Sequence, residues 1–153
     1  MESSTGIIFL DFTEKDKQHL LEAYVYIRSS IPSITDEFYR CLNLIGSGPQ
    51  NFGVEPENLA ALQAAHWRHL FNGRFDREYE NAARRIAIRH YEIGLPQDLY
   101  AMSYMKLLTL FHEENWKAPG IDRAHARLMT EAVTKAIAID MVHAISPYSG
   151  DLV

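Results

Sequence analysis

The sequence predicts an all-α fold in a single domain. Apolar residues recur at steps of three and four in six segments, which is the spacing of one helix face, and most prolines and glycines fall between these segments. The alternation of β-branched residues that is typical of strands is almost absent outside residues 7–10. With 153 residues, the chain is long enough for one domain with a sizeable core and too short for two of ordinary size.

The first helix is predicted to follow a short N-terminal arm, residues 1–12. The arm carries an apolar run that could pack on the domain or on a partner chain. Thr13 is a suitable N-cap for a helix that ends near Ser30, because its side chain can accept a hydrogen bond from the first turn. Asp16 in that turn complements the positive end of the helix dipole. We therefore expect an amphipathic helix after the arm.

The second helix is predicted to begin at Pro32. Its buried stripe comprises Ile34, Phe38, Cys41, Leu42 and Ile45. Tyr39 lies beside this stripe, so its hydroxyl can lie at the edge of a core or of a pocket. From the spacing alone, a tyrosine that packs its ring and leaves its hydroxyl in water is the simpler interpretation.

The third helix is predicted from Pro56 to Gly73 and carries two histidines. One side of it presents Leu59, Leu62, Gln63, His66, His69 and Leu70. His66 and His69 share a helix face, as a pair of metal ligands would, but the sequence indicates no further ligand nearby. We therefore interpret them as partly exposed helix histidines.

The stretch from Asp76 to Ile93 places one histidine on an apolar helix face and then ends the helix. The stripe is Tyr79, Ala83, Ile86, His90 and Ile93. Gly94 suits the left-handed residue after a helix and Pro96 suits the first turn of the next, so His90 lies in the last turn. Two interpretations are open. His90 is either a core histidine satisfied by backbone or water, or the axial ligand of a haem iron, for which a neutral imidazole is common.

The last two helices are predicted over residues 96–116 and 122–146. Tyr100 and Tyr104 lie one turn apart on the first of them. The second has a wide apolar face of Leu128, Ala132, Val133, Ala136, Ile137, Met141 and Ala144. A face wider than one neighbour requires suggests packing on two. We therefore expect a symmetric homodimer in which these two helices of each chain form a four-helix bundle, with Ile137 at its seam.

Charge and composition exclude several classes of function. The net charge of -5, with lysine and arginine scattered along the chain, argues against nucleic acid and against an anionic membrane surface as partners. No signal peptide and no apolar stretch of membrane-spanning length is evident. The single Cys41 cannot form an internal disulfide and is typical of a small buried residue. We expect a cytoplasmic protein.

Three segments of the chain resemble one protein family. Residues 85–96, RIAIRHYEIGLP, are similar to the family's run through its proximal histidine and the glycine and leucine that follow. Residues 66–76, HWRHLFNGRFD, resemble its join between the distal and proximal helices, and Phe38-Tyr39 resembles its distal tyrosine pair. Over about residues 13–148 the chain resembles the haem-binding domain of the globin-coupled sensors, bacterial proteins in which a globin precedes a signalling output domain.

The resemblance implies a globin fold, a haem b cofactor and a set of site residues. The implied cofactor-binding residues are Tyr39, Leu59, Leu62, His90, Tyr100 and Tyr104. His90 would be the proximal and only protein ligand of the iron, and Tyr39 the hydrogen-bond donor to the bound gas. Leu59 and Leu62 would form the wall of the distal pocket. Ala87 stands where the family usually has glycine, so helix and haem are expected to approach less closely here.

The implied function is that of a gas sensor domain rather than an enzyme. It would bind O₂, and also CO and NO, and pass the ligand state to an output domain in cis or in trans. Residues 13–148 would form the sensor globin domain and residues 149–153 the start of a linker. Two alternatives stay open: a free-standing globin that consumes O₂ or NO with an external reductase, and a haem-free interaction module. The first would need an acid/base pair that the sequence does not offer, and the second would be expected to lack His90.

Overall fold

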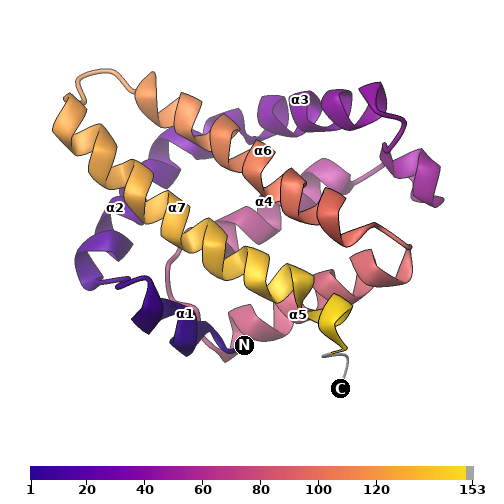
Figure 1. Ribbon diagram of the computed structural model, residues 1–153. Helices are drawn as coiled ribbons and strands as arrows, with labels where there is room; N and C mark the ends of the chain where they lie inside the picture. The colour runs from indigo at the N-terminus through magenta and orange to yellow at the C-terminus, as the bar shows by residue number, and fades with distance from the viewer. Residues whose placement is uncertain (151–153) are drawn as a thin grey trace.

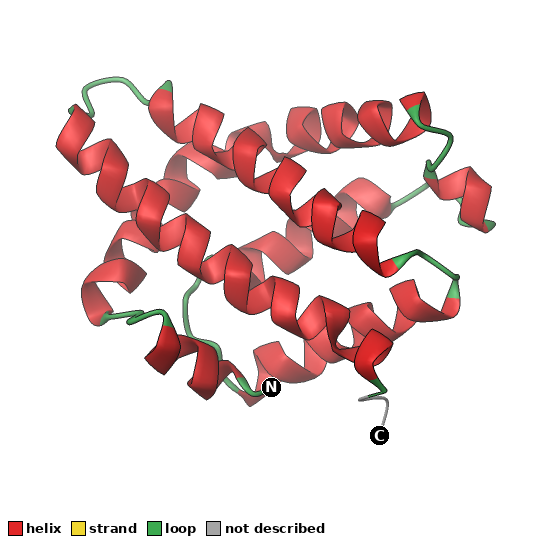
Figure 2. Cartoon of the chain, viewed as in Figure 1, coloured by secondary structure: helices red, strands yellow, loops and turns green. Residues whose placement is uncertain are grey.

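The structure, a computed structural model, describes residues 1–150 and contains helices but no strand in that range (Figure 2). The elements are α1 (Ser3–Phe9), α2 (Glu14–Ile27), η1 (Arg28–Ser30), α3 (Ile31–Leu44), η2 (Pro49–Phe52), α4 (Leu59–Leu70), α5 (Arg77–Glu92), α6 (Gln97–Trp116), α7 (Arg123–Ile145) and η3 (Ser146–Ser149). The prediction of an all-α fold is confirmed. None of the helices in the described range is both long and apolar enough to cross a membrane.

Helix α7 occupies the centre of the arrangement (Figure 1). It runs diagonally across the front of the view with α6 beside it, and it packs on α6, α2 and α5. Helix α3 lies at the top of this view and α5 at the bottom, with α4 behind and between them. Helices α3 and α5 therefore lie on opposite sides of α4 in this view.

The N-caps predicted at Thr13 and Asp122 are confirmed, and Asp76 is a third. Thr13 and Asp16 form a capping box at the start of α2: the Thr13 hydroxyl accepts from the Asp16 N–H, and the Asp16 carboxylate accepts from the Thr13 N–H. Asp76 and Asp122 cap α5 and α7 by a single bond each: one carboxylate oxygen accepts from the backbone N–H of Tyr79 or of His125. Each cap satisfies a backbone donor that the first turn leaves without a partner.

The third helix begins later than predicted. Helix α4 starts at Leu59, not at Pro56, because Asn58 has a left-handed backbone with φ of 68°. Asparagine tolerates this conformation, but a helix cannot continue through it. The prediction for Ile45 is also wrong: it follows the last residue of α3 and is 64% exposed.

The N-terminal arm is a short helix that packs on the domain. In α1, the Ser3 backbone N–H donates to Glu80 Oε1 at 2.8 Å, and Ser3 Oγ lies 2.8 Å from His143 Nε2. Gly6 lies so close to α7 that a Cβ there would come within 3.1 Å of Ile139 Cγ1. The apolar run is only partly used in this contact, since Ile8 and Phe9 stay exposed.

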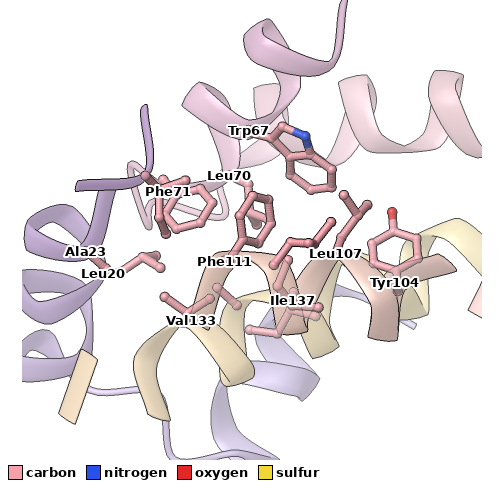
Figure 3. Close-up of a cluster of buried hydrophobic side chains, with 14 of the residues drawn as sticks. Leu20, Ala23, Trp67, Leu70, Phe71, Tyr104, Leu107, Phe111, Val133 and Ile137 are labelled. Carbon is pink, nitrogen blue, oxygen red and sulfur yellow. The ribbon is translucent and has the colours of Figure 1, made fainter. Parts of the chain in front are cut away.

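The core forms where α2, α4, α6 and α7 meet (Figure 3). Phe111 of α6 is fully buried, and its ring makes edge contacts with Trp67 at 5.3 Å and with Phe71 at 5.4 Å between centroids. Leu20 of α2 and Val133 of α7 close the other side and have no exposed surface. Edge-to-face aromatic pairs of this kind add to the stabilisation from buried apolar area.

The apolar face of α7 is covered within the chain, which corrects the basis of the dimer prediction. Ala132, Val133 and Ile137 have no exposed surface, and Ala136 has 1%. The face is wide because α7 packs on several helices of its own chain at once. Ile137 therefore lies in the core and cannot be a seam residue.

Candidate functional site

A cavity of about 550 Å³ lies between α3, α4, α5 and α6. Its volume is in the range of roughly 300–1,000 Å³ that is usual for ligand pockets. Apolar and aromatic side chains form most of its wall. All six residues predicted for the site line it: Tyr39, Leu59, Leu62, His90, Tyr100 and Tyr104. The structure thus brings together residues that are spread over 66 positions of the chain, from 39 to 104.

His90 lines the cavity from the last turn of α5 in one fixed orientation. Its Nδ1 lies 2.8 Å from the carbonyl oxygen of Ile86, and its ring stacks on Tyr100 with centroids 4.7 Å apart. The carbonyl can only accept, so Nδ1 carries the proton and Nε2 keeps its lone pair. Burial lowers the pKa of His90, and the nearby positive charges of His66 and Arg89 act in the same direction. At neutral pH the ring is therefore the neutral imidazole that a metal requires.

Tyr39 approaches the cavity from the other side and is held by a hydrogen-bond chain. Gln63 Nε2 donates to the Tyr39 hydroxyl oxygen at 3.1 Å, and the buried Thr35 hydroxyl donates to Gln63 Oε1 at 3.3 Å. Because Tyr39 accepts from Gln63, its own O–H proton is free to donate into the cavity. Burial raises the pKa of Tyr39, so the hydroxyl stays protonated.

The remaining predicted residues differ in how they reach the cavity. Leu59 is half-buried, whereas Leu62 lines the cavity and is still 65% exposed. Tyr104 contributes its ring to the cavity wall, because its hydroxyl donates to Asp140 Oδ2 at 2.8 Å. Ala87 is fully buried and does not line the cavity, so the expectation that it holds helix and haem apart has no support here.

Behind the cavity, four helices meet at the buried carboxylate of Asp140 on α7. Tyr79 and Tyr104 donate their hydroxyls to it, and His66 Nε2 lies 2.8 Å from Oδ2. Burial raises the pKa of Asp140, but the charge of His66 and the three hydrogen bonds outweigh it and lower the pKa. For His66, burial lowers the pKa and Asp140 outweighs that effect, so the pKa of His66 is raised. The interpretation of His66 as a partly exposed histidine is wrong, since its side chain is only 9% exposed.

Four residues of the site were not found by sequence reasoning. Arg85 and Arg89 lie one turn apart at the cavity on α5, and neither forms an ion pair within residues 1–150. Arg85 directly precedes Ile86 and Arg89 directly precedes His90 in the sequence. This position next to the apolar stripe was the signal that could have identified them. Gln63 and Asp140 each stand as a polar residue in an apolar stripe, which is a signal for a buried hydrogen-bonding role.

The joint between α5 and α6 connects His90 to the end of the described chain. Gly94 takes the left-handed conformation expected of it, with φ of 81°. The Tyr148 hydroxyl in η3 donates to the carbonyl oxygen of Leu95 at 2.5 Å, and its ring makes edge contacts with Tyr91 and Tyr100. One tyrosine therefore contacts both the joint and the ring on which His90 stacks.

A neutral histidine that faces an apolar cavity in an all-helical fold fits the proximal ligand of a globin haem. The model of the Protoglobin family matches residues 6–152. The chain therefore belongs to the protoglobin family, whose members bind haem, usually as haem b. The resemblance found in three sequence segments and the cofactor prediction are both confirmed.

The fold is also that of a solved globin domain. The chain is similar to the globin domain of the Geobacter sulfurreducens globin-coupled sensor, with a TM-score of 0.79 and 19% sequence identity over 95% of this chain and 96% of that one. At this identity the likeness establishes the fold alone. No protein of curated function matches the chain in sequence.

Proposed function

We propose that this protoglobin is a gas sensor domain: it binds O₂, and also CO and NO, at a ferrous haem b held by His90, and passes the ligand state to a signalling output domain. The observation that carries the proposal is the His90 imidazole, fixed by Ile86 with Nε2 unprotonated beside an apolar cavity. Absorption spectra of the ferrous, oxygenated and CO forms test it. A purified protein that takes up no haem would contradict it.

The residues at the cavity fit a haem. His90 offers the nitrogen ligand, and the apolar wall suits the porphyrin faces. Arg85 and Arg89 give the cavity two cationic groups, which could pair with the two carboxylates of a bound haem. Bound there, ferrous haem supplies an open coordination position for a diatomic gas. The protein holds the ring, excludes water and supplies a hydrogen-bond donor.

Tyr39 is the proposed donor to O₂. Its free hydroxyl proton can hydrogen-bond a ligand that gathers negative charge and helps nearly apolar CO much less. Tyr39→Phe is expected to speed O₂ release by about five- to twelve-fold, which corresponds to the roughly 1–1.5 kcal/mol of one net hydrogen bond. Stopped-flow release of O₂ and CO from the same variant measures this.

Gln63→Leu provides the comparison for the Tyr39 variant. It removes the donor that occupies the Tyr39 oxygen and leaves Thr35 without its acceptor, so Tyr39 loses its fixed orientation. O₂ release should change in the same direction as in Tyr39→Phe, but by less, since the hydroxyl is still present. Equal effects on CO and O₂ in both variants would rule out a selective donor.

The signal would leave the pocket through the α5–α6 joint. A movement of His90 displaces Tyr100, on which it stacks, and the joint at Leu95. Tyr148 contacts both, so η3 would follow the ligand state. An output domain, in cis or in trans, would read this change.

We retain the homodimer in the proposal, with a different contact. Helix α6 exposes three large apolar side chains on its outer face: Met102 at 68%, Met105 at 40% and Trp116 at 64%. A second copy of the chain placing its own α6 there would cover them symmetrically. The proposed bundle still contains α6 and α7 of each chain. The two chains meet through the exposed face of α6, however, and not through the buried face of α7.

Met105→Glu combined with Met102→Glu is expected to convert the dimer to a monomer that retains haem. The dimer should be lost because burying a carboxylate without a partner costs roughly several kcal/mol. Haem should be retained because neither residue lines the haem cavity. Light scattering over a concentration series gives the oligomeric state, and the Soret absorbance gives the haem content. Val25→Glu on α2, where Val25 is 53% exposed, is the matched control and should stay dimeric. A wild-type protein that is monomeric at high micromolar concentration would contradict the dimer.

An enzymatic globin is the competing proposal. A dioxygenase would consume O₂ steadily when a reductant and reductase are supplied, whereas a sensor would bind O₂ once per haem and stop. Oxygen-electrode traces of the haem-loaded protein separate the two. The haem-free alternative is not supported, because the chain belongs to a haem-binding family and has His90 at the cavity.

A further inference from the structure

A second group of ligating side chains lies away from the haem cavity, where α2 meets the start of α7. His19 and Glu22 are one turn apart on α2, and His125 lies in the first turn of α7. None of the three lines the haem cavity. The N-cap carboxylate of Asp122 accepts from the His125 backbone N–H at 2.7 Å and so fixes the position of this histidine. The group therefore joins two helices that pack extensively on each other.

The three side chains converge on one point. His125 Nε2 lies 2.6 Å from Glu22 Oε1, and His19 Nδ1 lies 3.9 Å from Glu22 Oε2. All three ligand atoms lie within 4.8 Å of one another. Nitrogen and oxygen ligands sit about 2.0–2.2 Å from zinc, so two of them at a tetrahedral angle are roughly 3.4 Å apart. The present spacings lie on either side of that value, and small side-chain rotations would close the site.

His19 supplies the observation that points to a ligand. Its Nδ1 is buried and has no hydrogen-bond partner in the part of the chain that the structure describes. A buried polar atom without a partner is unfavourable and is uncommon in native proteins. The His19 ring makes an edge contact with the His125 ring, with centroids 5.4 Å apart, so the two imidazoles lie together. A cation bound between the three groups would satisfy this atom.

We propose that His19, Glu22 and His125 form a binding site for a divalent transition-metal ion of the zinc type. Two imidazoles and one carboxylate are a ligand set that zinc accepts, with a fourth position left for water. The side chains are 20%, 37% and 33% exposed, so solvent and the ion can reach the site. The ion takes the place of the hydrogen between His125 Nε2 and Glu22 Oε1, which is released to solvent, and it links α2 to α7. Its site is separate from the haem, which allows the two to be measured independently.

Equilibrium dialysis of the haem-loaded protein against zinc, followed by elemental analysis, tests the proposal, because iron reports the haem and zinc reports the new site. We expect one zinc per iron in the wild type. His19→Ala and His125→Gln should lower the zinc affinity by at least the roughly 10–100-fold that follows loss of a partner around a metal site. His125→Gln keeps a donor for Glu22, so any loss there reflects the metal and not the broken hydrogen bond.

His112→Ala is the matched control. It removes a histidine from α6 that does not belong to the group, and it should leave zinc affinity unchanged. Far-UV circular dichroism and the iron content show whether each variant is folded. If His19→Ala does not fold, Glu22→Gln takes its place in the test, because it keeps the size of the side chain. A wild type that retains no zinc, or variants of all three residues that bind it with unchanged affinity, would overturn the proposal.

Discussion

His90→Ala is expected to yield protein that purifies largely free of haem. His90 Nε2 is the unprotonated nitrogen at the cavity, and its ring is held by Ile86 and Tyr100 in one orientation. Removing it takes from the cavity the imidazole nitrogen that we assign to the iron. The ratio of Soret absorbance to protein absorbance, with iron analysis, measures the loss. Added imidazole should restore haem binding in part, since it can occupy the space of the missing ring.

His66→Gln is the control for this prediction. His66 also lines the cavity, and its buried Nδ1 has no hydrogen-bond partner among residues 1–150, so it is the rival iron ligand. Glutamine can still donate to Asp140 but is a poor ligand for iron. We expect His66→Gln to keep its haem. Full haem content with an unchanged spectrum in His90→Ala would refute the assignment of His90.

Asp140→Ala is expected to destabilise the fold by about 3–5 kcal/mol, the usual effect of removing one partner of a buried charge pair. The substitution leaves His66, Tyr79 and Tyr104 without their acceptor and also opens a small cavity in the core. Urea unfolding of the haem-loaded protein, followed by far-UV circular dichroism, gives the change. Asp140→Asn keeps acceptor oxygen but not the charge and should lose less.

The effect of Asp140→Ala should depend on pH in a defined way. The folded pKa of Asp140 is lowered, so its contribution is present above its unfolded value of about 4 and is lost as pH falls through the folded pKa. The folded pKa of His66 is raised, so its contribution is present below its unfolded value of about 6.5 and is lost as pH rises through the folded pKa. The difference in unfolding free energy between wild type and variant is therefore largest between roughly pH 4 and 6.5. A difference that does not vary with pH would mean that the ion pair contributes nothing.

Much of the fold could be predicted from the sequence because local signals were strong. The caps at Thr13 and Asp122 act within one turn, and the glycine at position 94 follows a helix end by its own backbone preference. The cofactor-site residues were identified by family resemblance and then found together around one cavity. Their individual roles are still predictions.

The rest depended on contacts between segments that are far apart in the chain. The width of the α7 stripe could not reveal whether a second chain or helices of the same chain cover it, and Ile137 proved to lie in the core. The acceptor role of Asp140 required His66, Tyr79 and Tyr104 to meet from three other helices. The group of His19, Glu22 and His125 spans more than 100 positions and has no sequence signature.

Asp140 also bears on which of several similar helix packings the chain adopts. Helix α7 is apolar along most of its buried length, and apolar side chains alone would tolerate a shift of one turn, about 5.4 Å along the axis. In any shifted arrangement the carboxylate would be buried away from Tyr79, Tyr104 and His66 and would lose all of its donors. One charged side chain thus penalises every register except the native one, as single polar residues do in coiled coils. We expect Asp140→Leu to test this directly, by yielding a compact helical protein whose side-chain NMR signals report more than one packing.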